Sequence, residues 1–186
     1  EPGKALAARV AEVIFASHHE LPAAQAFYQD IRQRAAALGR DPDHIKILPG
    51  VTPFIGDTRE QAQALFDEFQ ALIDPVLGLR LLADTLGEDI DLSGHDLDGP
   101  LPETPAGERG SRRDQVLEVA RRDNLSIRQL YLRLAGGNPV IGTPEDIADT
   151  FEAWFQGRAC DGFNVFFPYF PGSIDTFVDR VIPLLQ

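Results

Sequence analysis

Apolar residues recur with a helical period in several parts of the chain. The clearest case follows Thr58, where six apolar residues fall at i, i+3, i+4, i+7, i+10 and i+11: Ala62, Leu65, Phe66, Phe69, Leu72 and Ile73. This spacing predicts one apolar face of an amphipathic helix, and Gln61 completes the spacing of a capping box with Thr58. The same period predicts further helices at about residues 4–11, 21–38, 111–123, 126–135, 144–155 and 173–185.

Short apolar runs lie between some of these helices and are typical of strands. They fall at residues 13–15, 45–48 and 161–167. Strict alternation of helices with short strands indicates parallel pairing through right-handed crossovers. Three parallel strands are too few to close a barrel, so we expect an α/β fold that is the carboxyl-terminal part of a larger (β/α)8 TIM barrel.

The alternation is interrupted between residues 74 and 137. Residues 74–110 are acidic and rich in proline and glycine, and we interpret them as a long ordered loop on the surface of the main fold. Two helices follow, with Ser111 and Ser126 as predicted N-caps, and Thr143 is the predicted N-cap of the next helix. We therefore expect one domain over residues 1–186, with an insertion at about 74–137.

Composition and charge exclude several classes of partner. The 17 Lys and Arg residues against 29 Asp and Glu give a net charge of −12, which disfavours nucleic acid and anionic lipid as partners. No apolar run approaches the roughly 20 residues that cross a bilayer. The first residues show no signal peptide. The single cysteine, Cys160, cannot form a disulfide within the chain, which fits a reducing compartment. We expect it to be a small buried apolar residue. We therefore expect a cytoplasmic protein.

Motifs that carry chemistry are scarce. His18 and His19 are adjacent on an extended segment, so their side chains point in opposite directions, and we expect no metal site there. The sequence has no G-x-S-x-G elbow and no glycine-rich phosphate loop of the Rossmann or Walker type. In parallel barrels, chemistry gathers at the carboxyl ends of the strands, which here are residues 16–20, 49–54 and 166–169. The residues alone indicate no more than part of an α/β barrel.

Five stretches in order resemble one family. They are residues 3–15 (GKALAARVAEVIF), 47–58 (ILPGVTPFIGDT), 97–103 (LDGPLPE), 140–149 (VIGTPEDIAD, running into DGFN at 161–164) and 177–186 (FVDRVIPLLQ). Together they resemble the bacterial-luciferase-like flavin monooxygenases. Within that family they are most similar to the branch of nitrilotriacetate monooxygenase component A, dibenzothiophene-sulfone monooxygenase and long-chain alkane monooxygenase. The resemblance covers essentially the whole chain.

This resemblance implies a TIM-barrel enzyme that receives reduced FMN from a separate NAD(P)H-dependent flavin reductase. With O₂ it would oxygenate a small organic substrate, and its full-length form would be a homo-oligomer. The family's phosphate-binding stretch survives here only as its tail, Glu1-Pro2-Gly3, and the earlier barrel strands are missing. The chain thus resembles about the last two-fifths of such an enzyme, and we expect the catalytic residues to lie upstream of residue 1.

Within this part, the resemblance makes Gly3 the candidate for FMN binding through its phosphate. The candidates for the substrate pocket lie at strand ends: Phe15, Ser17, His18, Phe54, Phe166 and Pro168. The alternatives are that Gly3 only begins a helix and that the other candidates are ordinary core or loop residues. Two other functions also stay open, namely a non-catalytic fragment or interaction module and a deazaflavin-dependent reductase of the same fold. The long loop at residues 74–110 and the stretch 97–103 within it favour the monooxygenase over the reductase. No residue distinguishes among the substrates of the branch.

Overall fold

The computed structural model of the chain describes residues 2–87, 90–92, 94–105 and 111–186. The helices are α1 (Pro2–Val10), α2 (Leu21–Ala37), α3 (Arg59–Ala71), α4 (Pro75–Leu86), α5 (Arg112–Arg122), α6 (Ile127–Ala135), α7 (Pro144–Gln156) and α8 (Gly172–Arg180), with short 3₁₀ turns at Pro42–His44 and Ile182–Leu184. The strands are β1 (Val13–Ala16), β2 (Lys46–Ile55), β3 (Pro139–Gly142) and β4 (Asn164–Val165). The chain divides into two compact units, unit 1 (Glu1–Phe66 and Asn138–Gln186) and unit 2 (Asp67–Gly137), which are described separately.

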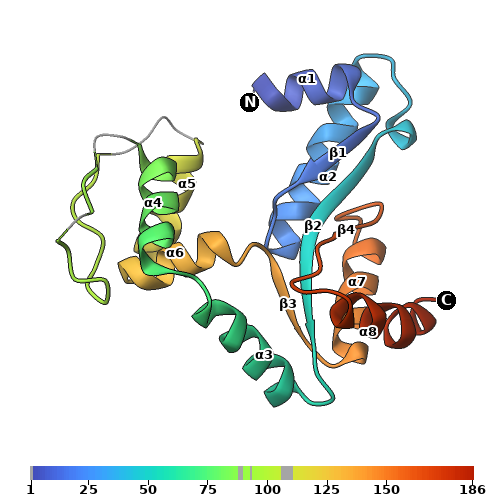
Figure 1. Cartoon of the computed structure of the whole chain (residues 1–186). Coiled ribbons are helices and arrows are strands. Elements are labelled where there is room, and N and C mark those ends of the chain that lie inside the picture. The colour runs from blue at the N-terminus through green and yellow to red at the C-terminus, as the bar shows by residue number, and fades with distance from the viewer. Residues whose placement is uncertain (1, 88–89, 93, 106–110) are drawn as a thin grey trace. The chain divides into compact units, whose positions relative to one another are not determined.

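Strand β2 is the centre of the sheet in unit 1, and all its pairings are parallel. β1 pairs with residues 46–49, β4 with residues 50–51 and β3 with residues 52–55. The amides of Lys46 and Thr52 bond toward β1 and β3, whereas the carbonyl of Val51 accepts from Phe166 beside β4. Successive residues of a strand direct their backbone groups to opposite edges. β1 and β3 therefore lie end to end along one edge of β2, and β4 lies along the other (Figure 1).

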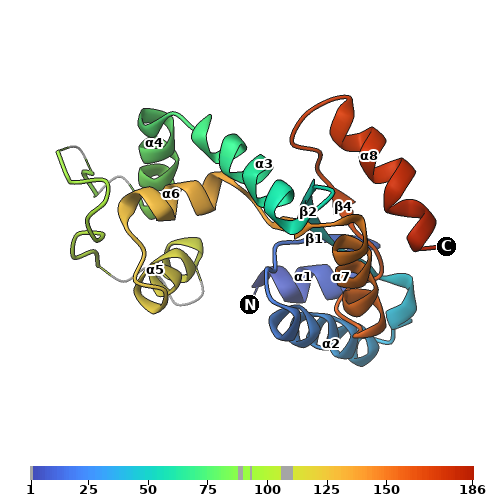
Figure 2. The same ribbon diagram turned by 90° about the horizontal axis from the view of Figure 1, so that it is seen from below.

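One face of this sheet is covered by helices. Odd-numbered residues of β2, such as Ile47 and Val51, pack against α2 and against α7 with α8. Ile31 of α2 and Ile147 of α7 are fully buried there. Figure 2 shows α1, α2 and α7 on the same side of the strands. The hydrophobic core of unit 1 thus lies between the sheet and these helices.

The opposite face of the sheet remains open over β1 and β4. Val13 and Phe15 of β1 are 60% and 59% exposed, and Phe166, just after β4, is 53% exposed. Parallel sheets usually have both faces covered, because their connections place structure on each side. An open apolar face is the arrangement expected for strands whose inner side faces the interior of a larger barrel.

The sheet corrects the expected strand set in three ways. β2 continues to Ile55, although its residues beyond Leu48 were expected to follow the strand. Pro49 and Pro53 are tolerated because they occupy odd positions, so the amide that each lacks is not needed by β1 or β3. Residues 139–142 form a fourth strand that the pattern did not predict. A run of four residues that begins with a proline is too short to show a clear alternation. β4 in turn keeps only residues 164–165 of the expected run 161–167.

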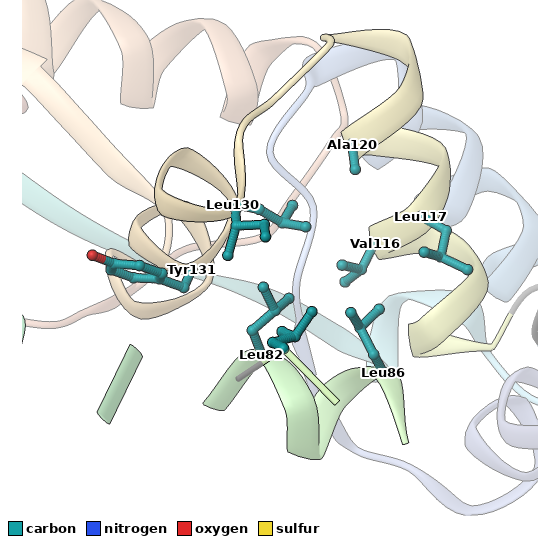
Figure 3. Packing of buried hydrophobic residues seen from close by; sticks show 9 residues of the cluster. Leu82, Leu86, Val116, Leu117, Ala120, Leu130 and Tyr131 are labelled. Carbon is teal, nitrogen blue, oxygen red and sulfur yellow. The ribbon is translucent and has the colours of Figure 1, made fainter. Parts of the chain in front are cut away.

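Unit 2 is helical and has a core of its own. Its α4, α5 and α6 contribute the buried residues of one hydrophobic cluster, whose side chains Figure 3 labels: Leu82, Leu86, Val116, Leu117, Ala120, Leu130 and Tyr131. Gly78 lets α4 approach α6 closely, because a Cβ at this position would lie 2.3 Å from Cδ2 of Tyr131. The unit thus has a buried core of its own, although Leu72, Val76 and Leu77 remain exposed.

Helix α4 corrects the expectation of a continuous loop at residues 74–110. The carboxylate of Asp74 accepts from the amides of Val76 and Leu77, and Pro75 follows at the first helical position, where its missing N–H costs nothing. Proline and glycine in this stretch were interpreted as loop signals, but here they begin a helix and permit its packing. The parts of the expected loop at residues 88–89, 93 and 106–110 lie outside the described residues.

Three of the expected helix caps are present, whereas the capping box expected at Thr58 is only half formed. Oγ1 of Thr58 accepts from the amide of Gln61 at 3.3 Å, but Oε1 of Gln61 accepts from the amide of Asp57 and not from that of Thr58. Thr143 and Ser126 each begin a helix through a capping box, with Asp146 and Gln129 as the reciprocal partners, and Ser111 accepts from the amide of Asp114. Cys160 is 1% exposed, and burial raises the pKa of its thiol to about 11. No described helix is long and apolar enough to cross a membrane. Among the described residues, no group of three His, Cys, Asp or Glu side chains could hold a metal ion.

Candidate functional site

Two aromatic rings meet across β2 on the open face of the sheet. The centroids of Phe15 and Phe166 are 6.1 Å apart, and their planes meet at 84° in an edge-to-face contact. Both rings cover Gly50, where an added Cβ would lie 2.8 Å from Cε2 of Phe15 and 2.9 Å from Cε2 of Phe166. A side chain at Gly50 would therefore push the two rings apart. Phe15, Gly50 and Phe166 together form an exposed apolar surface, called here the aromatic surface.

The segment after β1 places two imidazole rings against different partners. The ring of His18 packs on Phe27 of α2 with a centroid distance of 4.7 Å. Nδ1 of His19 lies 3.1 Å from Oδ1 of Asn138, the residue just before β3. Adjacent residues on an extended segment were expected to diverge in this way. Both histidines therefore lie at the carboxyl end of β1, the end at which parallel barrels carry their chemistry.

The environment of His18 favours its neutral form. Burial lowers the pKa of its imidazole below the ordinary value, and the positive charges of Lys4 and of His19 lower it further. Lys4 is held close by Asp30, whose carboxylate accepts from its ammonium at 2.8 Å. At neutral pH, His18 is therefore an uncharged ring with one donor and one acceptor nitrogen.

Gly3 lies in the first turn of α1. A Cβ at Gly3 would meet nothing within 4 Å, so the space beside its backbone is open, and the first turn of Pro2–Val10 carries no acidic residue. No acidic side chain in this turn would repel a phosphate, and the binding of the FMN phosphate at Gly3 stays a prediction. Glu1 lies outside the described residues.

The remaining candidates lie in different surroundings. Ser17 is exposed after β1, and Pro168 is half-buried two residues after Phe166. Phe54, by contrast, is 2% exposed and packs edge-to-face on Phe66 at a centroid distance of 5.1 Å. The cleft beside Phe54 measures about 10 Å³, which is room for about one water molecule. The structure thus brings Phe15 and Phe166 together and leaves Phe54 enclosed.

Sequence reasoning missed Gly50 and Asn138 as parts of this site. Gly50 had a usable signal, because a glycine inside a strand often marks the close approach of another group. Asn138 had none, because Gly-Gly-Asn-Pro is typical of an ordinary loop between two elements. Its importance arises from contacts with the segment after β1, which precedes it by more than a hundred residues.

Unit 2 holds a separate cavity of about 680 Å³. It lies between the extended segment at residues 100–105 and the helix α5, with Leu117 and Ala120 as its apolar floor. Arg121 lines the same cavity, and its Nη2 donates to the carbonyl of Thr104 at 3.4 Å. The aromatic surface of unit 1 shares no residue with this cavity.

Several known proteins similar to this chain are named as monooxygenases. N-acetyl-S-(2-succino)cysteine monooxygenase of Bacillus subtilis (strain 168) is 50% identical over 99% of this chain, which covers 43% of that protein. Nitrilotriacetate monooxygenase component A of Aminobacter aminovorans is 46% identical over 100% of this chain and 42% of that protein. The chain therefore spans about two-fifths of the length of these relatives. The resemblance noted from the sequence motifs is confirmed.

A solved structure and a family model agree with these relatives. EDTA monooxygenase from Chelativorans sp. BNC1 superposes with a TM-score of 0.76 at 34% identity, covering 100% of this chain and 42% of that chain. The predicted fold class is confirmed, since the parallel α/β arrangement matches part of a luciferase-like TIM-barrel monooxygenase. The model of the luciferase-like monooxygenase family matches residues 1–161. The chain therefore belongs to the luciferase-like monooxygenase family.

Proposed function

We propose that this chain is the carboxyl-terminal part of an FMN-dependent, two-component monooxygenase that oxygenates a small organic substrate. The observation that carries this proposal is the open apolar face of the sheet, where Phe15 and Phe166 meet over Gly50. Exposed aromatic rings on a parallel sheet favour a ligand or further structure over them. In a closed barrel this face would be the inner one, and its part at the carboxyl ends of the strands would border the reaction site.

The chain's own residues supply two parts of such a site. The start of α1 at Gly3 would bind the FMN phosphate through backbone amides, and the aromatic surface would form an apolar wall beside the flavin ring or the substrate. Ser17 and His18 lie at the same strand end as Phe15 and would contact the substrate from its polar side. When bound, reduced FMN supplies the electrons with which O₂ is activated. Phe54 and Pro168 would act farther out, as support for the wall.

Other features of the complete enzyme belong to the same proposal. A separate NAD(P)H-dependent reductase would supply the reduced FMN, the protein would be a homo-oligomer, and it would work in the cytoplasm. The names of the relatives support an oxygenase over a deazaflavin-dependent reductase and over a non-catalytic interaction module. Those names also provide the first substrates to test, N-acetyl-S-(2-succino)cysteine and nitrilotriacetate.

Anaerobic titration with reduced FMN, followed by flavin fluorescence, tests this function. We expect micromolar binding by the protein expressed from its complete natural gene, and little binding by residues 1–186 alone, which hold only part of the site. Tight FMN binding by residues 1–186 would contradict the division of the site proposed here. Formation of an oxygenated product from either named substrate, compared with a reaction without protein in which O₂ only oxidises the reduced FMN to give peroxide, then tests the reaction.

A matched pair of variants tests the phosphate site. Gly3→Asp places a carboxylate in the first turn of α1, whereas Gly3→Asn adds the same shape without the charge. Repulsion between the carboxylate and the phosphate predicts that Gly3→Asp binds reduced FMN at least about tenfold more weakly than Gly3→Asn. Equal affinities would show that the phosphate lies elsewhere.

A further inference from the structure

The open face of the sheet carries two polar side chains among apolar ones. Val51 of β2 and Val165 of β4 pack on the covered face. Side chains alternate between the two faces of a strand, so Thr52 and Asn164 belong to the open face, as Gly50 does. The strand residues around them on this face are uncharged and apolar: Phe15, Leu48, Gly50, Phe54, Ile141 and Phe166.

The side chain of Asn164 provides an acceptor on this face. Its Nδ2 donates to the carbonyl of Leu48 at 3.2 Å. Because a carbonyl can only accept, this contact fixes which end of the Asn164 amide is the NH₂ group, and Oδ1 is at the other end. Asn164 is half-buried, and no donor among the described residues bonds its Oδ1. A ligand on this face would therefore meet an acceptor that needs a donor.

The hydroxyl of Thr52 is the second polar group. Thr52 is half-buried, and its hydroxyl makes no hydrogen bond within the part of the chain that the structure describes. Gly50 pairs with Asn164, and Thr52 lies two residues farther along β2. The usual strand spacing and rise therefore place the Cα atoms of Thr52 and Asn164 roughly 8 Å apart. Both polar groups thus lie next to the aromatic surface.

These two groups indicate the chemistry of a ligand by the hydrogen bonds that they can make. Oδ1 of Asn164 needs a donor, and the hydroxyl of Thr52 can donate to an acceptor. A charged group would be costly here, because the strand residues around the pair are uncharged and supply no counter-charge. A secondary amide meets these conditions, since it is neutral and carries its N–H donor and its C=O acceptor on opposite sides.

We propose that Thr52 and Asn164 are specificity-determining residues that bind an amide group of the substrate. Asn164 accepts from the amide N–H, and Thr52 donates to the amide C=O. This inference rests on the proposed monooxygenase function and names its substrate class, small organic molecules that carry an N-acyl group. The probe is N-acetyl-S-(2-succino)cysteine. The matched probe is S-(2-succino)cysteine, which has an ammonium group in place of the acetamide and is otherwise the same.

Steady-state kinetics with these two probes test the substrate class. The protein is expressed from its complete natural gene and supplied with reduced FMN and O₂, and the oxygenated product is measured. We expect kcat/KM to be at least about tenfold higher for the probe with the acetamide, because the other probe offers a charged group and no C=O. Similar kcat/KM values for the two probes would overturn the proposal, and this measurement needs no variant to fold.

Thr52→Val removes the hydroxyl and keeps the shape of the side chain. The preference for the acetamide probe should fall about fivefold or more, mainly through KM, because the C=O loses its donor. Thr150→Val is the matched control, since the hydroxyl of Thr150 donates to the carbonyl of Asp146 within α7, on the covered side of the sheet. An unchanged preference in Thr52→Val, or the same loss in Thr150→Val, would overturn the contact of Thr52.

Asn164→Asp tests the second contact by changing which probe is preferred. A carboxylate pairs better with the ammonium of S-(2-succino)cysteine than with an amide N–H, so the preference should shift toward that probe. Loss of the contact with Leu48 would instead weaken both probes equally. An unchanged preference in Asn164→Asp would therefore overturn the contact of Asn164 with the substrate and leave it a support of the sheet.

Three outcomes separate the failure of this inference from the failure of the proposed function. Absence of oxygenated product from both N-acetyl-S-(2-succino)cysteine and nitrilotriacetate would overturn the monooxygenase function and this inference with it. Oxygenation of nitrilotriacetate alone, which has no amide, would leave the enzyme in place and overturn the amide site. Weaker binding of reduced FMN by Thr52→Val, with equal losses for both succinocysteine probes, would show that the flavin and not the substrate lies over Thr52.

Discussion

Leu82 in unit 2 and Phe15 in unit 1 are both large apolar residues on regular elements, yet they have opposite surroundings. Leu82 is 0% exposed among helices α4, α5 and α6, whereas Phe15 is 59% exposed on the open face of the sheet. The helical unit can bury the side chains of its core because α4, α5 and α6 turn an apolar face toward one another, although Leu72, Val76 and Leu77 stay exposed. A sheet has two faces, and the helices of unit 1 pack on the face opposite to Phe15.

The difference supports the proposal that the open face of unit 1 takes part in binding a ligand. Single exposed apolar residues are ordinary, but two aromatic rings in contact over a glycine form a shaped patch. The residues of unit 2's core serve stability, so changes there should alter the free energy of unfolding. Changes on the open face should alter binding instead.

The largest loss of stability is expected on removal of the Asp161 carboxylate, which accepts hydrogen bonds from α2 and β2. Oδ1 of Asp161 accepts from the hydroxyl of Tyr28 at 3.0 Å and from Nη2 of Arg32 at 2.7 Å, and Oδ2 accepts from the amide of Ile47 at 2.8 Å. Asp161→Ala leaves all three donors without this acceptor and should lower the free energy of unfolding by about 3–5 kcal/mol. Chemical denaturation followed by circular dichroism measures the loss.

Asp43 is the control for this substitution. It also accepts from Arg32, at 2.7 Å, but its side chain is 87% exposed. Asp43→Ala should therefore cost much less than Asp161→Ala, because water replaces the lost contact. If both substitutions lower the free energy of unfolding equally, the contacts of Asp161 with α2 and β2 are not an important source of stability.

The second prediction tests the comparison itself. Leu82→Ala opens a cavity in the core of unit 2 and should cost about 2–5 kcal/mol. Phe15→Ala removes a larger side chain, yet it should cost under about 1 kcal/mol, because the ring is already mostly in water. Hydrogen exchange resolved by unit measures both. A large loss of protection in unit 1 of Phe15→Ala would mean that the open face is needed for stability.

The third prediction concerns the aromatic surface. Gly50→Ala places a Cβ against the outer edges of both rings, which can rotate away, so the expected cost is about 1 kcal/mol. Reduced FMN or substrate should nevertheless bind several-fold more weakly, because the edge-to-face pair is separated. Gly162→Ala is the control, since its Cβ would meet only Cδ2 of Leu48, at 3.1 Å. Unchanged ligand affinity in Gly50→Ala would remove the aromatic surface from the site.

The smallest effect on stability is expected for exposed ion pairs, which occur in both units. In unit 2, the guanidinium of Arg122, supported by that of Arg133, lowers the pKa of Asp123 from 3.8 to about 2. A folded-state pKa below the unfolded one means that this stabilisation is present above about pH 4 and is lost as the pH falls toward 2. NMR titration of the Asp123 carboxyl group checks the pKa, and a value near 3.8 would contradict the pairing.

The helices differ in whether nearby residues alone predict them. The helix at Pro144–Gln156 follows from Thr143 and the apolar spacing after it, because a cap and a helical face involve residues three or four positions apart. The same local rules failed for α4, since Pro75 and Gly78 were interpreted as loop signals although Asp74 is a good cap. Their meaning depends on Tyr131, against which Gly78 packs.

The amino-acid sequence by itself determined the helical faces, the helix caps, the parallel α/β order and the family resemblance, because each depends on neighbours along the chain or on motifs in order. Only the tertiary structure decided that β1 and β3 share one edge of β2 and that Phe15 meets Phe166. It also decided that Asn138 bonds His19. These pairs are far apart in the sequence, and a side-chain pattern shows that a residue is apolar or polar but does not show which distant residue it will contact.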